Sequence, residues 1–386
     1  MNDFEYLGEG EVYLDAACQS LRPQPVIEAL NKYYTEHNSC GERVKYKWGR
    51  VTDEKVEETR EKVLKFLKLK PKKYTVSFTL NTTYGINLIL SQLKAGEFKK
   101  VITSEIEHNS PFLATIAFAN RTGLPREVVK RNNDGSIDLS GDFTKAVVVV
   151  NCASNFDGRK LLNISELVKT VHKAGGIVII DAAQAMAHSV DILKGVEVDA
   201  ICFSAHKLYA PSLGVIVWRD ELMDKLDYGF VGGGMVDDVT EKDYKPSAEG
   251  KEHRYTRFES GLQAWGEIVG LGAAIDWLEN LPKKDWKNLW DNANDLYDFL
   301  EESPKVHLVN HEANPTISFY VEGVDSHLLG EALSRENIMA RTGYFCAHYY
   351  LDHVLGLPPL VRFSLGLHNK PEDIEKVKKV LGKILN

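Results

Sequence analysis

The sequence has few cysteines, and their positions follow no pattern. The 386 residues include five of them, at positions 18, 40, 152, 202 and 346, without a C-x-x-C pair. This scatter excludes a disulfide framework and a thiolate zinc site. It is typical of a protein that works in a reducing compartment.

Long apolar runs and an excess of positive charge are also absent. No apolar stretch approaches the roughly 18 residues that a membrane-spanning helix needs. The formal net charge is −8, which argues against a nucleic-acid-binding surface. The first residues read M-N-D-F-E-Y-L, which is acidic and lacks the basic start and apolar core of a secretory signal. We therefore expect no membrane or nucleic-acid partner and a cytoplasmic location.

Short apolar runs are the main structural signal in the first part of the chain. Helical patterns such as residues 164–173 separate these runs, and each run is apolar throughout rather than at alternate positions. The runs cover residues 75–80, 101–103, 146–150, 177–180, 200–203 and 214–218. Continuous apolar runs are typical of strands buried on both faces, as in a parallel sheet covered by helices. We therefore predict an α/β fold with a mostly parallel sheet.

The length and the change of pattern after residue 282 indicate two domains. Residues 261–278 are apolar and rich in small side chains, as expected of a long buried helix, and Leu281-Pro282 ends it. Beyond this point helices alternate with isolated strands near 316–321 and 361–365. We predict a large domain over residues 15–282 and a small α+β domain formed by residues 1–14 and 283–386.

Two charged side chains directly follow apolar strands. Lys207 lies in F-S-A-H-K-L-Y-A-P, and Asp181 lies in V-I-I-D-A-A-Q. Ligands of open α/β sheets bind outside the carboxyl ends of the strands. A lysine there can serve as a Schiff-base amine, and an aspartate can pair with the ring nitrogen of a pyridoxal cofactor. Alternatively, Lys207 is a surface lysine in a loop and Asp181 is a helix N-cap.

Polar residues follow three further strands. Thr82 and Thr83 lie between a strand and a helix, where hydroxyls and free N–H groups can seat a phosphate. His108 follows another strand and could present its flat ring to a cofactor, and Asn155 lies beyond a third. Each of these residues could equally be a helix cap. The coincidence of five polar strand ends is what favours a phosphorylated, aldehyde-bearing cofactor.

Taken together and in this order, the motifs resemble the class V aminotransferase family of fold-type I pyridoxal-phosphate (PLP) enzymes. The resemblance runs from Y-L-D-A-A, residues 13–17, to R-F-S-L-G, residues 362–366. Within the family, the sequence is most similar to Suf-type cysteine desulfurases and selenocysteine lyases. The segment R-T-G-Y-F-C-A, residues 341–347, resembles their loop that carries a persulfide cysteine.

The resemblance implies a large domain with a mostly parallel, seven-stranded sheet, a small α+β C-terminal domain, and a role for each matching residue. Lys207 would bind PLP and move the substrate Cα proton, and Asp181 would hold the pyridine nitrogen protonated. Cys346 would take up the sulfur as a persulfide. The remaining residues would contact the cofactor or the substrate carboxylate: Gln184 at the ring hydroxyl, His108 stacked on the ring, Thr82, Thr83, Ser204 and His206 at the phosphate, and Asn155, Arg341 and Arg362 at the carboxylate.

The sequence departs from the family pattern in three places. Asn109 stands where the family has a second histidine. Leu262 replaces a threonine whose hydroxyl would reach the phosphate of a neighbouring subunit. The family's H-R-G segment is not evident in V-K-Y-K-W-G-R, residues 44–50, where Lys45, Lys47 or Arg50 could substitute.

The expected function is a homodimeric, PLP-dependent cysteine desulfurase acting on L-cysteine. It would pass sulfur to an acceptor or scaffold protein, for example in iron–sulfur cluster assembly. Alternatives are a selenocysteine lyase, another class V aminotransferase, epimerase or C–S lyase that does not need Cys346, and a scaffold without catalysis. Taken alone, Cys346 also fits a small buried side chain. The histidine pairs at 307/311 and 348/353 lack a third ligand, so we predict no metal.

Overall fold

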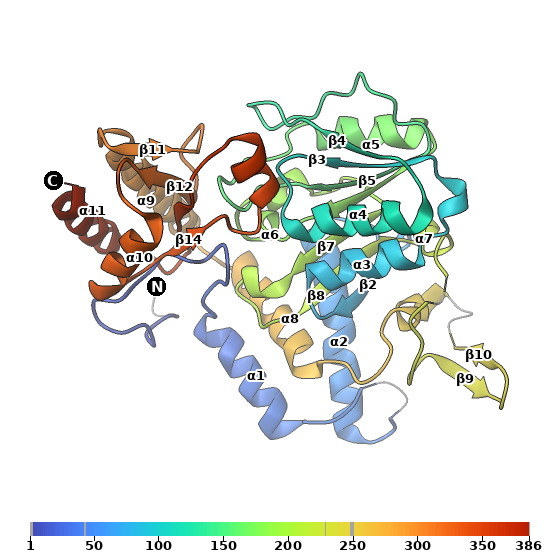
Figure 1. Cartoon of the computed structure of the whole chain (residues 1–386). Coiled ribbons are helices and arrows are strands. Elements are labelled where there is room, and N and C mark those ends of the chain that lie inside the picture. Colours follow the sequence, from blue (N-terminus) through green and yellow to red (C-terminus); the bar gives the residue numbers. More distant parts are fainter. Residues whose placement is uncertain (1–2, 42–43, 228, 248–250, 386) are drawn as a thin grey trace.

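A seven-stranded mixed sheet lies at the centre of the larger part of the molecule (Figure 1). The computed structural model describes residues 3–41, 44–227, 229–247 and 251–385. The strands of this sheet, in spatial order, are β2 (Tyr74–Thr79), β8 (Gly214–Arg219), β7 (Ala200–Ser204), β6 (Ile177–Asp181), β5 (Ala146–Asn151), β3 (Lys100–Ser104) and β4 (Arg126–Val129). Only β8 runs antiparallel to its neighbours, so the prediction of a mostly parallel sheet is confirmed.

Helices cover both faces of this sheet, which explains why its strands are apolar throughout. In β5, Val147 and Val149 pack into one core, while Val148 and Val150 pack into the other. The first core also contains side chains from α3 (Thr82–Gln92), α4 (Asn109–Thr122) and α7 (Asp220–Met223). The second contains side chains from α2 (Lys47–Phe66), α5 (Ile164–Lys173), α6 (Ala185–His188) and α8 (Trp265–Glu279), and from α1 (Gln24–Glu36), which packs against α8.

A second, antiparallel sheet lies beside the first, in the C-terminal part of the chain (Figure 1). Its strand order is β11 (Val306–Leu308), β12 (Thr316–Val321), β15 (Leu360–Ser364) and β14 (Arg341–Gly343). The accompanying helices are α9 (Lys283–Glu301), α10 (Ser326–Arg335) and α11 (Pro371–Leu385). The N-terminal strand β1 (Val12–Tyr13) pairs with β13 (Ile338–Met339), so the start of the chain lies against its C-terminal part.

Some element boundaries differ from the predictions. The predicted helix over residues 261–278 begins only at Trp265, because Gly261 has a left-handed backbone with φ of +85°. Helix α2 begins at Lys47, whereas the amphipathic pattern of the sequence predicts a helix only over residues 54–67. The short strand β4 and the hairpin of β9 (Val236–Val239) and β10 (Tyr244–Pro246) were not predicted. In the described part of the chain, no helix combines the length and the apolar character needed to cross a bilayer.

A buried ion pair between Arg60 and Glu259 holds residues 258–261, F-E-S-G, against the sheet. The Arg60 guanidinium donates two hydrogen bonds to the Glu259 carboxylate, at 2.8 and 2.7 Å. Glu259 also accepts from the Phe78 backbone N–H, and the Arg60 guanidinium lies 3.6 Å from the centre of the Tyr255 ring. Because both charges are buried, each depends on the other for stabilisation.

We predict that Glu259→Ala lowers the free energy of unfolding by about 3–5 kcal/mol, since it leaves the Arg60 charge buried without its partner. Glu57 is the matched control, because it also pairs with Arg60 but its side chain is 53% exposed. Glu57→Ala should cost no more than about 1 kcal/mol. Urea unfolding followed by tryptophan fluorescence measures both losses. Equal losses for the two variants would contradict the assignment.

Candidate active site

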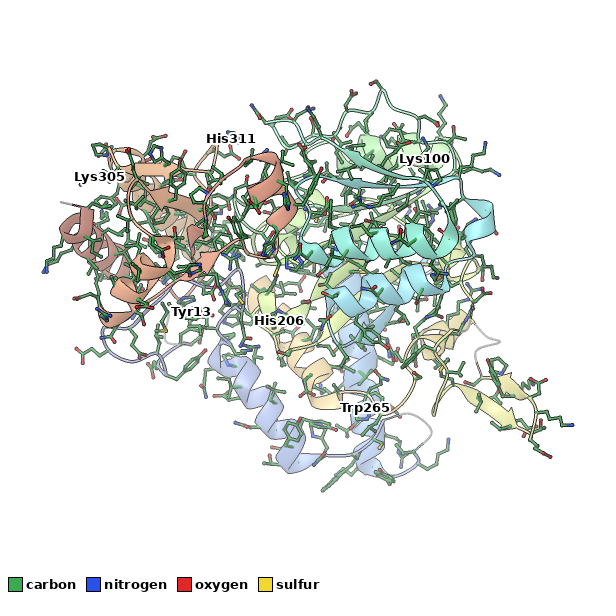
Figure 2. All side chains as sticks on the ribbon, viewed as in Figure 1. Tyr13, Lys100, His206, Trp265, Lys305 and His311 are labelled. Carbon is green, nitrogen blue, oxygen red and sulfur yellow. The ribbon has the colours of Figure 1, made fainter. Side chains whose placement is uncertain are left out.

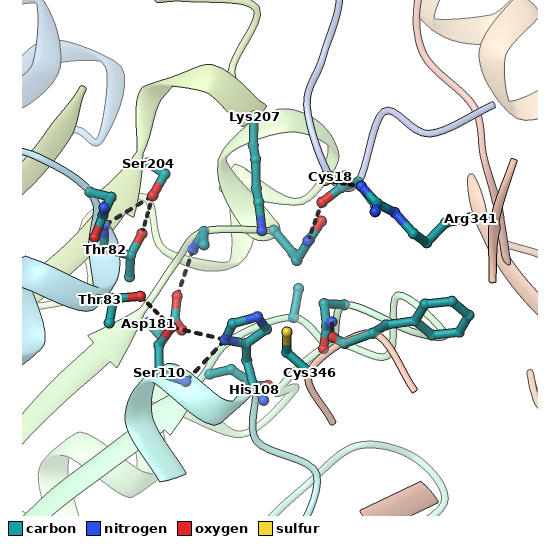
Figure 3. Close-up of a pocket in the computed structure, with 18 of the residues that line it drawn as sticks. Cys18, Thr82, Thr83, His108, Ser110, Asp181, Ser204, Lys207, Arg341 and Cys346 are labelled. Carbon is teal, nitrogen blue, oxygen red and sulfur yellow. Dashed lines mark hydrogen bonds between the residues drawn. The ribbon is translucent and has the colours of Figure 1, made fainter. Parts of the chain in front are cut away.

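A cavity of about 540 Å³ opens at the carboxyl ends of the central parallel strands, where the second sheet meets the first (Figure 3). All twelve predicted site residues line it, although they come from seven separate segments of the chain. They are Thr82, Thr83, His108, Asn155, Asp181, Gln184, Ser204, His206, Lys207, Arg341, Cys346 and Arg362. The structure therefore brings these twelve side chains together around one cavity.

Lys207 and Asp181 follow neighbouring parallel strands. Asp181 ends β6, and Lys207 lies in a short helical turn directly after β7. Burial lowers the pKa of the Lys207 amine, which the Asp181 carboxylate partly offsets. Burial raises the pKa of Asp181, and the Ala183 N–H and Lys207 oppose this change. The lysine is thus shifted toward the neutral amine that acts as a nucleophile or base.

Three hydroxyl groups gather at the N-terminus of α3. The Thr82 hydroxyl lies 2.7 Å from the Ser204 hydroxyl, which also accepts from the Thr82 backbone N–H. Thr83 lies beside them, and its hydroxyl contacts Ser110 at 2.6 Å. Hydroxyls and free N–H groups at a helix start can bind an anionic group. This end of the cavity can hold a phosphate.

His108 caps α4 and presents its ring to the cavity. Its Nδ1 accepts a hydrogen bond from the Ser110 backbone N–H at 3.0 Å (Figure 3). Burial, with smaller contributions from Lys207 and Arg362, lowers the pKa of His108 to about 4. The ring is therefore neutral at pH 7, which suits stacking on a flat cofactor. His108 therefore both caps helix α4 and lines the cavity.

The Cys346 thiol lies in a loop with an unusual backbone. Phe345 and Cys346 are consecutive non-glycine residues with positive φ, 50° and 58°. Such residues are uncommon and are stabilised only by the surrounding structure. Here the Asn155 side chain donates to the Phe345 carbonyl at 2.6 Å, and the Asn109 N–H donates to the Cys346 carbonyl at 2.6 Å. These contacts anchor the loop while Cys346 itself stays exposed.

Asn109 and Asn155 thus both touch the Cys346 loop. Asn109, a departure from the family pattern, also approaches His348 at 3.4 Å. The Asn155 amide nitrogen is engaged by the loop, while its Oδ1 is buried and finds no hydrogen-bond partner among the described residues. For Asn155 the geometry supports a loop-anchoring role directly.

Sequence reasoning missed two residues of this region. Cys18 lines the cavity, and Arg341 donates a hydrogen bond to its sulfur at 2.6 Å. No sequence pattern indicates a site role for Cys18, and the structure places it at the cavity. Asp15 forms ion pairs with both Arg341 and Arg362. Both lie in or next to the Y-L-D-A-A segment, which was noticed only as part of the resemblance.

The other departures lie outside the cavity. Lys45, Lys47 and Arg50 are not among its described lining residues. Leu262 is 77% exposed at the surface. His311 is exposed in the C-terminal part, whereas His206 is half-buried and lines the cavity (Figure 2). Within the described residues, no three or more His, Cys, Asp or Glu side chains gather in a way that could hold a metal ion.

The lining residues match the chemical groups of PLP. The hydroxyls at α3 suit its phosphate, Lys207 its aldehyde, Asp181 its ring nitrogen and the neutral His108 ring its flat face. Gln184 lies in the same cavity, with its amide nitrogen donating to the Ala17 carbonyl at 2.8 Å. The residues present therefore fit this cofactor.

A buried carboxyl group supports the cavity floor. Glu107 accepts from the Asn151 N–H at 2.7 Å and contacts the Ser104 hydroxyl, next to His108. Burial raises the pKa of Glu107 to about 7, although Arg131 acts in the opposite direction. At neutral pH this carboxyl group is poised between its two forms.

The Glu107 shift predicts a specific pH dependence of stability. Between pH 4.5 and 7 the folded chain keeps a proton that the unfolded chain has lost, so the free energy of unfolding falls as pH rises. Glu107→Gln should remove a decline of roughly 3 kcal/mol across this window. Urea unfolding of both proteins from pH 5 to 8 measures the difference, which also cancels the other titrating groups. Parallel curves would contradict the prediction.

Comparisons with known proteins agree with this geometry. The Aminotransferase class-V profile matches residues 12–377. A probable cysteine desulfurase of Chlamydia muridarum is 32% identical over 97% of this chain and 94% of its own length. The apo structure of a cysteine desulfurase from Thermococcus onnurineus NA1 has a TM-score of 0.86 and 27% identity, covering 100% of this chain and 98% of its own. A C-DES mutant with glycine covalently linked to its PLP cofactor has a TM-score of 0.79 and 18% identity, covering 98% of both chains. The chain belongs to the class V aminotransferase family.

Proposed function

We propose that the protein is a PLP-dependent cysteine desulfurase that converts L-cysteine to L-alanine and takes the sulfur onto Cys346. One observation carries the proposal: the exposed Cys346 thiol and the Lys207 amine line the same cavity, beside a buried arginine. The similarity to named cysteine desulfurases over nearly the full chain supports it.

Lys207 and Asp181 would prepare the substrate. Bound PLP supplies an electron sink for the negative charge that develops at Cα. Lys207 would hold the cofactor and then accept the Cα proton, for which its lowered pKa is suited. Asp181 would keep the ring nitrogen protonated, because a buried carboxylate favours a positive partner. The hydroxyls of Thr82 and Ser204 would fix the phosphate.

Arg362 and Cys346 would handle the substrate's two ends. Arg362 would bind the carboxylate, since a guanidinium fork matches that geometry. The Cys346 thiolate would attack the substrate sulfur, so that an S–S bond forms and the Cβ–S bond breaks. The electron pair of the broken bond would pass to the substrate Cβ, which gains a proton, and Lys207 would return the proton to Cα before the product leaves as alanine. Cys346 remains as a persulfide until an acceptor removes the outer sulfur.

We also propose a homodimer whose interface includes exposed apolar side chains near the start of α3. These are Leu80, Phe230, Val231 and Leu262, each more than half exposed. The segments that carry them are neighbours, since the Gly261 N–H donates to the Gly233 carbonyl and the Phe230 ring contacts Tyr84. Burial of such side chains between subunits would be favourable. Leu262 would then contribute apolar contact where the family has a hydroxyl.

Three further features of the proposal concern the whole chain. Residues 15–282 would form the cofactor-binding domain, and residues 1–14 with 283–386 would form the smaller domain. Limited proteolysis should then cut first near residue 282.

A sulfur acceptor or scaffold protein would reach the exposed Cys346. All five thiols are unpaired, which supports a reducing, cytoplasmic location. Alkylation of all five in freshly isolated, denatured protein would agree with this.

Two variants separate cofactor binding from sulfur transfer. Lys207→Ala should lose both the yellow absorbance of bound PLP and cysteine turnover. Cys346→Ser should keep the absorbance while alanine and sulfide formation, measured with a dithiol reductant, fall by roughly a hundredfold or more. Cys40→Ser is the matched control, because Cys40 is exposed outside the cavity. Full activity of Cys346→Ser would exclude the desulfurase and favour a lyase or aminotransferase.

The dimer predicts a distinct behaviour in solution. Leu262→Arg places a charge in the proposed interface and should shift the protein from dimer to monomer in sedimentation equilibrium. Leu328→Arg serves as control, since Leu328 is 63% exposed on α10, outside the proposed patch. A wild-type protein that sediments as a monomer would rule out this interface.

A further inference from the structure

Two arginines stand directly opposite each other at the edge of the cavity. Strands β14 and β15 pair so that Arg341 lies across from Arg362. Side chains at opposed positions of an antiparallel pair are close, with Cβ atoms about 5 Å apart, and like charges there repel each other. Both arginines line the cavity. This arrangement requires a negative group nearby.

Asp15 supplies that negative group from behind the two arginines. One oxygen of its carboxylate accepts from Arg362 Nη2 at 2.9 Å. The other accepts from Arg341 Nε at 3.1 Å and lies 3.0 Å from Nη2 of the same residue. The backbone around Asp15 is fixed on β15, because the Ala16 N–H donates to the Ser364 carbonyl and the Ser364 N–H donates to the Leu14 carbonyl.

The Arg362 guanidinium has five N–H donors, and its contacts with the protein do not use all of them. Its Nη1 donates to the Asn155 carbonyl at 2.9 Å. Its Nε is buried and has no hydrogen-bond partner among the residues that the structure describes. Arg362 is only 3% exposed, so leaving this donor unpaired is costly. Because Arg362 lines the cavity, its remaining donors can serve an acceptor that enters there.

The net charge of Asp15, Arg341 and Arg362 together is +1. The two guanidinium groups carry two positive charges, and the Asp15 carboxylate neutralises one. One positive charge remains for a ligand, which matches the single carboxylate of cysteine. Without Asp15, the cluster would have one positive charge more and Arg341 would be free to accept a second acidic group.

We propose that Asp15 is a positioning residue that limits the Arg341–Arg362 pair to binding one carboxylate. The site would then select amino acids with one carboxylate over those with two. This rests on the proposed amino-acid site but concerns its selectivity. Asp15 acts through Arg341 and Arg362, because the cavity is lined by the arginines and not by Asp15.

The test compares two ligands with the PLP-loaded protein. L-alanine carries one carboxylate and L-aspartate carries two. Isothermal titration calorimetry at constant ionic strength gives the ratio of their dissociation constants without any sulfur transfer. The wild type should favour alanine, and Asp15→Asn should shift the ratio toward aspartate by roughly tenfold or more, the effect of one close charge pair.

Two further variants separate charge from structure. Asp15→Glu keeps the charge and should keep the wild-type ratio. The double variant Asp15→Asn/Arg341→Gln again has one net positive charge, so it should return the ratio to that of the wild type, even where Asp15→Asn alone is poorly folded. An unchanged ratio in folded Asp15→Asn, or a double variant that keeps the shift, would overturn the proposal. A failure of cysteine turnover in the wild type would instead refute the desulfurase function and leave this ratio measurable.

Discussion

The parallel alignment of β5, β6 and β7 is the constraint on which the site depends. Parallel neighbours end at the same edge, so the residues that follow them meet without any long loop. Asp181 and Lys207 therefore lie close together in a buried environment, where each changes the pKa of the other. Burial alone would suppress both charges, and their proximity limits that loss. The cofactor end of the cavity is a product of sheet topology.

The substrate end depends on a different part of the fold. Strand β15 carries Arg362 toward the cavity, and the Cys346 loop follows the neighbouring strand β14. The large sheet anchors that loop through Asn155 and Asn109, which follow β5 and β3. Residues that follow strands of both sheets thus line the cavity. The polar contacts of Asn155 and Asn109 with the Cys346 loop hold the thiol in position. These contacts also stabilise a backbone that is otherwise rarely adopted.

Much of the cofactor end could be predicted from the sequence, because its residues directly follow apolar strands. The resemblance to a family supplied the roles, including those of Cys346 and Arg362. The opposed register of Arg341 and Arg362, and the position of Asp15 between them, could not be predicted from the sequence. A register between distant strands leaves no local pattern, since it depends on how the turns and the partner strands pack. Cys18 was missed for the same reason, because its contact with Arg341 joins two ends of the chain.

The contact between Asp15 and Arg362 also bears on the order in which the two ends of the cavity can assemble during synthesis. The two residues are 347 positions apart in the chain. Lys207 and Asp181 leave the ribosome long before Arg362, so the cofactor end can assemble first on the growing chain. Asp15 is synthesised 347 residues before Arg362, so this ion pair can form only after Arg362 has left the ribosome. A chain stopped before β15 would contain the residues for the cofactor but no arginine pair to hold a substrate.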